Sequence, residues 1–493
     1  MRVQVIGSGI AGLSSALRLA CAGYEVEVFE ANAYPGGKLT QFKLGDYRFD
    51  AGPSLFTLPE LVLDLIKLAG KNPETHFPYI QLEQSCNYFY EDGTRFSAWS
   101  DPQKFAAEIE EKLKVPKEKV LNYLQDAAFK YKVTAPLFVE NTLHRLSAYS
   151  LKETLSGILA MPKLDLFDTM DEVNQDFFSS PHLQQYFNRF ATYNGSDPYQ
   201  APGLLTMIPH LEHGLGSYFP KQGMHQITET IYQLALEKGV SFHFNSRVDK
   251  IRVENNRVKG LEVNGQFYPS DLVVSNSDMH PLYRRLLRTE KQPEKLLDQE
   301  KSSSALIFYW GIRGSFPELV MHNIFFSSNY KKEFDTIFKK KSIDEDPTIY
   351  INITSKHKAD DAPDGCENWF VMVNAGHNTG EQNWDELIAS TRKNILSKLG
   401  RILQADIEPL IEVEDYLDPR RIEARTSSYG GSLYGNSSNN RFAAFLRHKN
   451  FSSSIKGLYL CGGSVHPGGG IPLCLNSGKI VSELIQEDWP IQN

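Results

Sequence analysis

The sequence predicts an α/β protein in which a parallel, nucleotide-binding sheet is assembled from segments near both ends of the chain. Residues 3–6 are an apolar run, a G-x-G-x-x-G motif follows at 7–12, and a helical pattern leads to a second strand pattern that ends at Glu30. Near the other end, the strand pattern GLYLC precedes a glycine-rich loop at 462–472 and a helical pattern that continues to residue 485. Strand, glycines and helix in this order are typical of nucleotide binding.

The residues of the first motif have separate physical roles. Gly7 permits a tight turn, Gly9 lets a diphosphate approach the backbone, and Gly12 lets the helix pack closely on the strand. The helix N-terminus offers free N–H groups and a positive dipole end to an anion. Glu30 is placed to accept hydrogen bonds from a ribose. The alternative is a glycine-rich turn that binds no ligand. Such a turn does not explain why a strand, the glycines, a helix, a second strand and a terminal acid follow one another at the expected spacing.

Composition and cysteine spacing argue against several classes of protein. The 493 residues are enough for two or three domains, and the net charge of −8 argues against a nucleic-acid partner. No apolar run approaches the ~18 residues of a membrane span. The five cysteines are scattered without a CxxC pair, which favours a cytoplasmic location without disulfides. His210 and His213 lack a third ligand, so we predict no metal site.

Further elements follow in chain order. The loops PGGKL at 35–39 and FDAGPS at 49–54 suit close passage of a phosphate or flavin, although a plain turn uses the same residues. A strand, a meander and a last buried strand are expected between residues 240 and 276. A substrate-binding half is expected from a hairpin at 86–98, strands at 304–312, 348–353 and 369–374, and a helix at 384–399.

One apolar stretch stands out within a mostly polar helical region at 101–190. Residues 151–167 read LKETLSGILAMPKLDLF, and Pro162 is expected to end or kink any helix there. Such a stretch with lysine flanks suits a membrane interface. The alternative is a helix packed on its own domain, because most apolar stripes are core. The lysine-rich region 331–341 is a second candidate for contact with anionic lipid, or a solvated face.

Taken together, these motifs resemble a known family. The series G-x-G-x-x-G, Glu, P-G-G-K and F-D-x-G-P is similar to the flavin amine oxidase and phytoene desaturase superfamily. The run VHPGGGIP at 465–472 resembles the T-H-P-G-x-G-I-P run of bacterial-type phytoene and carotenoid desaturases, which amine oxidases lack. The stretches FDAGPSLFTLPEL, ATYNGSDPYQAPG and PLCLNSGK most resemble 1-hydroxycarotenoid 3,4-desaturases, whereas phytoene desaturases more often have glycine at the position of Asn476. The run PKQGM at 220–224 matches the family pattern only in part.

The resemblance implies a Rossmann-like FAD-binding domain of the two-dinucleotide-domain flavoprotein type, with FAD held non-covalently. A mixed-sheet substrate domain and a helical, membrane-associated subdomain are expected as insertions into this FAD-binding domain. The expected bounds are 1–80, 215–300 and 445–493 for the FAD domain, 81–100 and 301–444 for the substrate domain, and 101–214 for the helical subdomain. The residues expected to contact FAD are Gly7, Gly9, Ile10, Ala11, Gly12, Glu30, Ala31, Gly37, Lys38, Leu39, Gly52, Pro53, Ser54, Val248, Asn276, Gly462, Gly463, Gly470, Ile471 and Pro472.

The implied activity is an oxidoreductase reaction that introduces a trans C=C into a carotenoid, with 3,4-desaturation of a 1-hydroxycarotenoid as the preferred hypothesis. Oxidised flavin accepts a hydride from an allylic C–H, and a weak base takes the neighbouring proton. The candidate bases are Glu212, His213 and His210, each of which has a structural role as its alternative. The expected partners are a carotenoid, a membrane surface, and a quinone or oxygen as electron acceptor, which makes the protein a cytoplasmic, peripheral membrane enzyme.

Several alternatives stay open at this stage. Within the same family, the chain suits a phytoene desaturase or an isomerase or saturase of polyenes. On the same fold, amine oxidases and protoporphyrinogen oxidases use other substrates. A non-enzymatic isoprenoid carrier is a further alternative, although the intact glycines and Glu30 argue against it.

Overall fold

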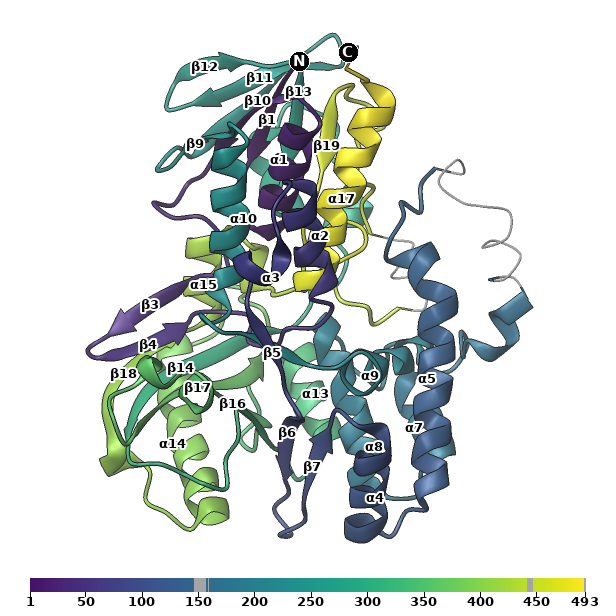
Figure 1. Ribbon diagram of the computed structural model, residues 1–493, viewed down its shortest axis with the longest axis vertical. Coiled ribbons are helices and arrows are strands. Elements are labelled where there is room, and N and C mark those ends of the chain that lie inside the picture. Colours follow the sequence, from purple (N-terminus) through teal and green to yellow (C-terminus); the bar gives the residue numbers. More distant parts are fainter. Residues whose placement is uncertain (146–156, 158, 441–446, 492–493) are drawn as a thin grey trace.

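The computed structural model describes residues 1–145, 157, 159–440 and 447–491. The chain forms two lobes, and both termini lie at the far end of one of them (Figure 1). The predicted α/β class is confirmed, because this lobe contains a parallel sheet and the other contains a mixed sheet.

The parallel sheet forms the centre of the nucleotide-binding lobe. Its strand order is β19-β13-β1-β2-β9, and every neighbouring pair is parallel. The strands are β1 (Arg2–Ile6), β2 (Glu25–Phe29), β9 (Ser241–His243), β13 (Leu272–Ser275) and β19 (Leu458–Leu460). The sheet therefore joins the first strand of the chain to the last, as the sequence predicts.

Helices cover this sheet, and α1 (Ile10–Cys21) packs against both α10 (His225–Glu237) and α17 (Ile471–Asp488) (Figure 1). A small residue makes one of these contacts possible. A Cβ on Gly478 of α17 would lie 2.7 Å from the carbonyl oxygen of Ala11. The lobe also contains α2 (Glu60–Leu68), α3 (Pro73–His76), and the antiparallel strands β10 (Val248–Glu254), β11 (Arg257–Val263) and β12 (Gln266–Pro269), which form the predicted meander.

The second lobe is built on a seven-stranded sheet with the order β18-β14-β17-β16-β15-β6-β7. All neighbouring strands are antiparallel except β15 and β6. Its strands are β6 (Gln84–Phe89), β7 (Arg95–Trp99), β14 (Ser304–Arg313), β15 (His322–Phe325), β16 (Ile349–Ile353), β17 (Cys366–Ala375) and β18 (Ile411–Leu417). Two short antiparallel pairs also occur, the hairpin of β3 (Gln41–Leu44) with β4 (Tyr47–Asp50) and the long-range pair of β5 (Tyr79–Gln81) with β8 (Tyr218–Pro220).

Because side chains alternate along each strand, the two faces of the mixed sheet pack against different parts of the molecule. On β14, Phe308 and Trp310 belong to the buried cluster that includes residues of α14 (Trp384–Leu403). Ile307 and Tyr309 lie in a separate cluster on the opposite face. Because side chains alternate along a strand, a register shift by one residue would exchange the two faces. This second face is turned toward the functional site described below.

A layer of helices flanks the mixed sheet. It consists of α4 (Pro102–Leu113), α5 (Lys117–Phe138), α7 (Met170–Phe177), α8 (Pro181–Asn188) and α9 (Pro209–His213), while α13 (Tyr330–Phe338) and α15 (Pro419–Thr426) lie beside the strands. Among the described residues, no helix is both long and apolar enough to cross a membrane. The exact boundaries of the three predicted domains stay a prediction.

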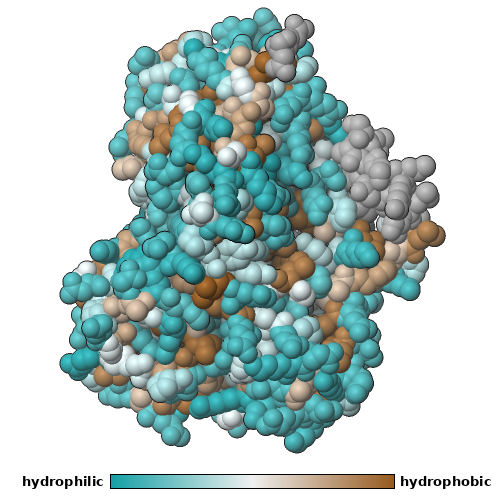
Figure 2. All heavy atoms as spheres, in the orientation of Figure 1, coloured by the Kyte–Doolittle hydropathy of each residue, from teal (hydrophilic) through white to brown (hydrophobic). Residues whose placement is uncertain are grey.

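The apolar stretch 151–167 is described only in part, since residues 151–156 and 158 lie outside the described residues. Of the remainder, Leu159 is 80% exposed, Met161 51% and Phe167 76%, whereas Leu164 is 4% exposed. Figure 2 shows apolar surface on the helical layer beside the grey segment. Leu164 therefore belongs to the core of the helical layer, and the other three side chains face solvent.

Candidate functional site

The first glycine loop has the geometry that its motif predicts. Gly7 adopts a φ of +87°, and its N–H donates to the carbonyl of Phe29 at 2.8 Å. A Cβ on Gly12 would lie 2.2 Å from the carbonyl oxygen of Gly7, so the helix can approach the strand only without a side chain there. Gly36 donates to the carbonyl of Ser8 at 2.8 Å, which holds the loop 35–39 against the motif.

The N-terminus of α1 is open toward a cavity. Gly9 is its N-cap, no side chain caps the helix, and the first turn contains no acidic residue. The N–H of Gly12 donates to Oδ1 of Asn276 at 3.1 Å, while Gly9, Ile10 and Ala11 line the cavity. Helix termini of this kind bind anions through main-chain N–H groups and the helix dipole.

Glu30 ends β2 and is buried beside this helix terminus. Its Oε2 accepts from the N–H and the hydroxyl of Ser8, at 2.8 and 2.7 Å, and its Oε1 accepts from the N–H of Asn32 at 2.8 Å. A carboxylate has about four acceptor sites, so one remains for a ribose hydroxyl. Glu30 and its neighbour Ala31 both line the cavity.

The second glycine loop reaches the same cavity from the other end of the chain. Gly470, with a φ of +105°, is the N-cap of α17, again without a side-chain cap. Asn276 connects the two loops, because its Nδ2 donates to the carbonyl of Cys461 at 3.3 Å while its Oδ1 accepts from Gly12. A Cβ on Gly9 would lie 2.6 Å from this amide, and one on Gly462 would lie 2.4 Å from it. Glycine on both sides therefore makes room for Asn276.

The loops 35–39 and 50–54 complete this half of the cavity. A Cβ on Gly52 would lie 2.0 Å from the carbonyl oxygen of Lys38. The Nζ of Lys38 donates to the carbonyls of Ser432 and Leu433, at 3.1 and 2.9 Å. Burial lowers the pKa of Lys38 to about 8, although the carboxyl of Asp278 partly opposes this shift.

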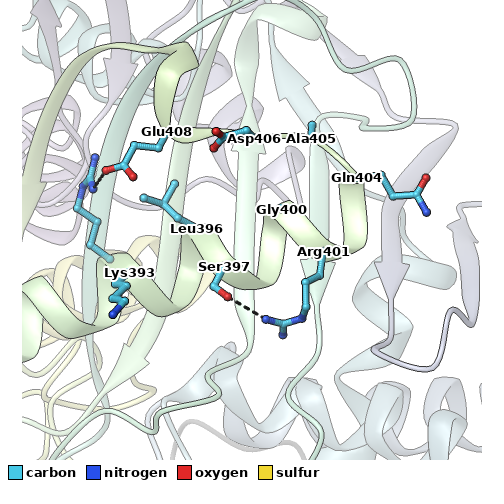
Figure 3. A pocket seen from close by; sticks show the side chains of 10 residues that line it. Lys393, Leu396, Ser397, Gly400, Arg401, Gln404, Ala405, Asp406 and Glu408 are labelled. Carbon is cyan, nitrogen blue, oxygen red and sulfur yellow. Dashed lines mark hydrogen bonds and ion pairs between the residues drawn. The ribbon is translucent and has the colours of Figure 1, made fainter.

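All of these elements surround one cavity of ≈ 640 Å³. It is lined by eighteen of the twenty residues expected to contact FAD, from Gly7 to Pro472, including Gly37, Leu39, Pro53, Val248, Gly463 and Ile471. The other two, Gly12 and Gly462, lie behind the wall, where they permit close backbone packing. A separate hollow of ≈ 610 Å³ lies on α14 (Figure 3). It is lined by polar side chains such as Arg392 and Glu408 and contains neither glycine loop.

Beyond the glycine loops, the cavity continues between the mixed sheet and the helical layer. The alternate face of the sheet contributes side chains that lie in register across strands, since Ile307 pairs with Met372, and Met372 pairs with Tyr350. The residues from this face are Ile307, His322, Ile324, Tyr350, Phe370 and Met372, and those from the helical layer include Tyr131, Phe138, Leu205, Ile208 and Leu211. This half is therefore largely apolar and aromatic.

A charged pair interrupts the apolar wall. Nη2 of Arg189 donates to both carboxylate oxygens of Glu212, at 3.2 and 3.3 Å, and the hydroxyl of Tyr193 donates to the same carboxylate. Burial raises the pKa of Glu212, but the positive charge of Arg189 and the Tyr193 hydrogen bond outweigh it and hold the pKa below its ordinary value. Glu212 is therefore ionised, and it lines the cavity.

Of the three candidate bases, Glu212 alone is among the residues of the cavity wall. His213 is buried behind it, with Nε2 2.5 Å from the hydroxyl of Tyr186 and Nδ1 3.2 Å from the carbonyl of Trp99. Burial lowers the pKa of His213 to about 4 and also lowers that of His210, whose ring lies 5.3 Å from the ring of Tyr131. Both histidines have the surroundings of structural residues.

Sequence reasoning missed Tyr350 and His322, which form a second set of polar side chains in this wall together with Ser54, a predicted FAD contact. The hydroxyls of Ser54 and Tyr350 are 2.7 Å apart, and the Tyr350 hydroxyl is 2.7 Å from Nδ1 of His322. These residues come from three distant segments, so no local motif contains them. The available signal was a polar residue at alternate positions of apolar strands, such as Tyr350 in TIYINI.

Two open helix termini at the edge of a parallel sheet, with a glycine-lined cavity between them, define a dinucleotide-binding oxidoreductase. The chain belongs to the flavin-containing amine oxidoreductase family, which matches residues 10–486 and confirms the predicted superfamily. It is 54% identical over 481 residues, 98% of each chain, to a 1-hydroxycarotenoid 3,4-desaturase from Flavobacterium sp.. It is 31% identical over 490 residues, 99% of this chain and 98% of the relative, to a 4,4'-diapolycopene oxygenase from Methylomonas sp..

Solved structures share the fold at low sequence identity. An oxidoreductase from Methanosarcina mazei matches with a TM-score of 0.63 and 16% identity, over 98% of this chain and 100% of that chain. Cyclohexylamine oxidase from Brevibacterium oxydans matches with a TM-score of 0.61 and 15% identity, over 99% of each chain. The protein is an FAD-dependent oxidoreductase, as predicted. The cavity suits that cofactor, because glycines let its diphosphate approach two helix termini and Glu30 keeps an acceptor for its ribose.

Proposed function

We propose that this protein is a carotenoid desaturase that introduces a trans double bond between C3 and C4 of a 1-hydroxycarotenoid. The high identity to a relative of that name over nearly the whole chain supports this assignment. The single structural observation that carries it is the cavity, which continues from the glycine loops into an apolar, aromatic chamber. Such a chamber suits a long polyene and excludes water from the reacting carbons.

The reaction requires few side chains. Bound FAD supplies the two-electron acceptor for the hydride that leaves the allylic carbon. The ionised carboxylate of Glu212 accepts the proton from the adjacent carbon, and the electrons of that C–H bond form the new double bond. Arg189 keeps this carboxylate ionised, and Tyr193 fixes its orientation. The expected terminal electron acceptor is a quinone or oxygen.

The cofactor contacts follow from the residues that surround the cavity. Gly9, Ile10 and Ala11 would hold the diphosphate through main-chain N–H groups, and Glu30 would hold the ribose. The second helix terminus, at Gly470 to Pro472, would stabilise negative charge on the flavin. The main chain at Val248 would hold the adenine, and we expect FAD to be bound without a covalent link.

We further propose that the protein docks on a membrane surface at the cytoplasmic side. Leu159, Met161 and Phe167 are exposed in one segment, and Lys163 of that segment lies 5.7 Å from the ring of Phe129 on α5. Because α5 also contributes to the cavity wall, this surface is close to the chamber. An insoluble substrate could pass from lipid to the cavity over this short distance.

Incubation of the purified holoprotein with a 1-hydroxycarotenoid in liposomes tests the proposed function. A product that has lost two hydrogens and absorbs at longer wavelength supports it. A product that has gained oxygen would assign the activity of the more distant relative instead. An isomer of unchanged mass, a product that has gained hydrogens, or turnover of amines alone would each exclude desaturation.

A further inference from the structure

The side chains of Ser54, Tyr350 and His322 form a hydrogen-bonded chain in the wall of the cavity. We propose that this chain recognises the C1 hydroxyl of the substrate by accepting a hydrogen bond from it. The proposal rests on the proposed function and makes Ser54, Tyr350 and His322 specificity-determining residues. Three observations support it: the direction of the hydrogen bonds, the place of the chain in the cavity, and the different role of the charged pair in the same wall.

The direction of the hydrogen bonds follows from Asn352. Its Nδ2 donates to the carbonyl of Met321 and to Nδ1 of His322, both at 3.2 Å. Nδ1 of His322 is therefore an acceptor, which is consistent with burial lowering the pKa of this histidine to about 4 and keeping it neutral. The hydroxyl of Tyr350 must then donate to Nδ1. Burial also holds the pKa of Tyr350 well above its ordinary value, so this proton stays in place.

The proton of Tyr350 is thus committed to His322, and the Ser54 hydroxyl donates to the Tyr350 oxygen. What remains for a ligand are lone pairs on the oxygens of Ser54 and Tyr350, since each hydroxyl oxygen has two, and the Nε2–H of His322, which is buried without a hydrogen-bond partner among the described residues. Ser54 and Tyr350 are half-buried and belong to the cavity wall. The chain therefore presents an acceptor, and its natural partner is a group that carries a proton, such as an alcohol. An ether, a ketone or a hydrocarbon lacks that proton.

The chain lies where the two halves of the cavity meet. Ser54 directly follows Gly52 and Pro53, which belong to the cofactor half, whereas Tyr350 and His322 come from the mixed sheet. In a 1-hydroxycarotenoid that reacts at C3 and C4, the hydroxyl carbon is two bonds from the first reacting carbon. Its recognition site must consequently lie beside the cofactor and not deep in the apolar chamber. The Ser54–Tyr350–His322 chain satisfies this requirement.

The charged pair in the cavity has a different role. Arg189 and Tyr193 occupy three of the about four acceptor sites of the Glu212 carboxylate, and the proposed mechanism needs the remaining site for the proton that leaves the substrate. Around the chain, the wall includes the apolar side chains of Ile307 and Ile324. A substrate hydroxyl that met no partner there would lose its hydrogen bonds to water without replacement, which disfavours binding. A hydrogen-bond acceptor already present in the wall removes this desolvation cost for the hydroxylated substrate only.

The test compares two substrates with the same polyene, one with the C1 hydroxyl and one without it. For the parent protein, we expect kcat/KM to be at least about tenfold higher with the hydroxyl, because a site built to bond a hydroxyl rejects an analogue that lacks it. In Tyr350→Phe, this ratio should fall toward one. Flavin absorbance and the melting temperature establish that the variant is folded and loaded. A parent that does not discriminate, or a variant that keeps the full ratio, overturns the proposal.

Two further arms separate specificity from structure. Tyr309→Phe is the matched control, because Tyr309 is buried on the same sheet, is not among the residues that line the cavity, and donates its hydroxyl proton to the carbonyl of Ala51 at 2.7 Å. Its substrate ratio should equal that of the parent. Ser54→Ala should lower the ratio as Tyr350→Phe does, which keeps the test valid if the tyrosine variant fails to fold. A ratio that falls equally in the Tyr309 variant contradicts the proposal.

A 1-methoxy analogue tests the direction of the hydrogen bond. Its oxygen has no proton to donate, so the parent should process it less efficiently than the hydroxy substrate. Equal turnover of methoxy and hydroxy substrates would show that the site does not accept a proton, and the proposal would fail. If the parent desaturates none of these polyenes, the proposed function itself is wrong. Desaturation of all of them at equal rates contradicts the recognition site alone.

Discussion

The two halves of the cavity hold their ligands with different parts of the chain. In the cofactor half, the main chain forms most of the wall, and Gly9, Gly12 and Gly52 leave no room for a Cβ. In the substrate half, side chains from the mixed sheet and the helical layer form the wall, with Arg189 and Glu212 as a buried charged pair. We infer that the cofactor half tolerates almost no substitution, whereas the substrate half can change its specificity by exchanging side chains of similar shape.

The largest effect is expected from Gly12→Val, which places a side chain in the backbone contact of the cofactor half. Because its Cβ would lie 2.2 Å from the Gly7 carbonyl, the variant should lose its FAD and more than about 3 kcal/mol of unfolding free energy. Flavin absorbance and chemical denaturation measure both. Gly70→Val is the matched control, since no atom lies within 4 Å of that Cβ and only a positive φ opposes it. Full FAD content in Gly12→Val would contradict the inference that the cofactor half tolerates almost no substitution.

In the substrate half, Glu212→Gln preserves the shape of the side chain but removes the proposed proton acceptor. We expect kcat to fall by about 10²-fold or more, as is typical for loss of a general base, while FAD content stays at the parent level. Stopped-flow reduction of the flavin by substrate measures the step directly. A normal rate of flavin reduction would assign the proton to another acceptor and leave Glu212 with a structural role.

The docking surface is a third region that belongs to neither half. Leu159, Met161 and Phe167 should be replaced together by serine, since all three are exposed whereas Leu164 is buried. Each apolar side chain withdrawn from lipid loses about 1 kcal/mol or more, so binding to liposomes should fall at least tenfold in flotation assays. FAD content should not change. Leu68→Ser, at an exposed leucine on α2, controls for a general loss of apolar surface. Unchanged flotation of the triple variant would redirect attention to the lysine-rich region 331–341.

Glu30→Ala tests the one side chain on which the cofactor half depends for the ribose. Loss of charge-assisted hydrogen bonds, worth about 1.5–3 kcal/mol each, should weaken FAD binding roughly tenfold or more. Titration of the apoprotein with FAD, followed by fluorescence quenching, gives the affinity. Glu27→Ala is the control on the same strand, because Glu27 is half-buried and bonds to Gln4 at 3.3 Å outside the cavity. Equal affinities for both variants would mean that the main chain alone holds the cofactor.

The smallest effect is expected from acid. Burial lowers the pKa of His213 in the substrate half and of His466 in the second glycine loop to about 4. Between pH 6.5 and 4 the unfolded chain takes up protons that the folded chain does not, so the unfolding free energy falls as the pH falls, by at most about 1.4 kcal/mol per pH unit for each histidine. Denaturation at several pH values should show a shallower slope in His213→Gln and in His466→Gln. A slope identical to the parent in both variants contradicts this assignment.

The same contrast explains what the sequence could predict. The cofactor half depends on glycines and one acid in contiguous motifs, and steric necessity fixes their spacing, so Gly7 to Glu30 and the run at 465–472 were found directly. The fold class followed from the same motifs. The substrate half depends on His322 and Tyr350, which strand register brings together, and on Ser54, a loop residue almost 300 positions before Tyr350. No local sequence pattern contains that register. For the same reason, the sequence could not distinguish Glu212 from His213 and His210 as the proton acceptor, because only their surroundings in the fold differ.

Asn276 also has a consequence for the order of events during synthesis. Its amide joins Gly12, 264 positions earlier in the chain, to Cys461, 185 positions later. The strand β19, which completes one edge of the parallel sheet, and α17 come from the same late segment as Cys461. At about 5–20 residues per second, the ribosome needs tens of seconds to pass from Gly12 to this segment. The segment that contains Gly12 therefore waits with an incomplete sheet, and we expect cofactor loading to begin only after α17 has been synthesised.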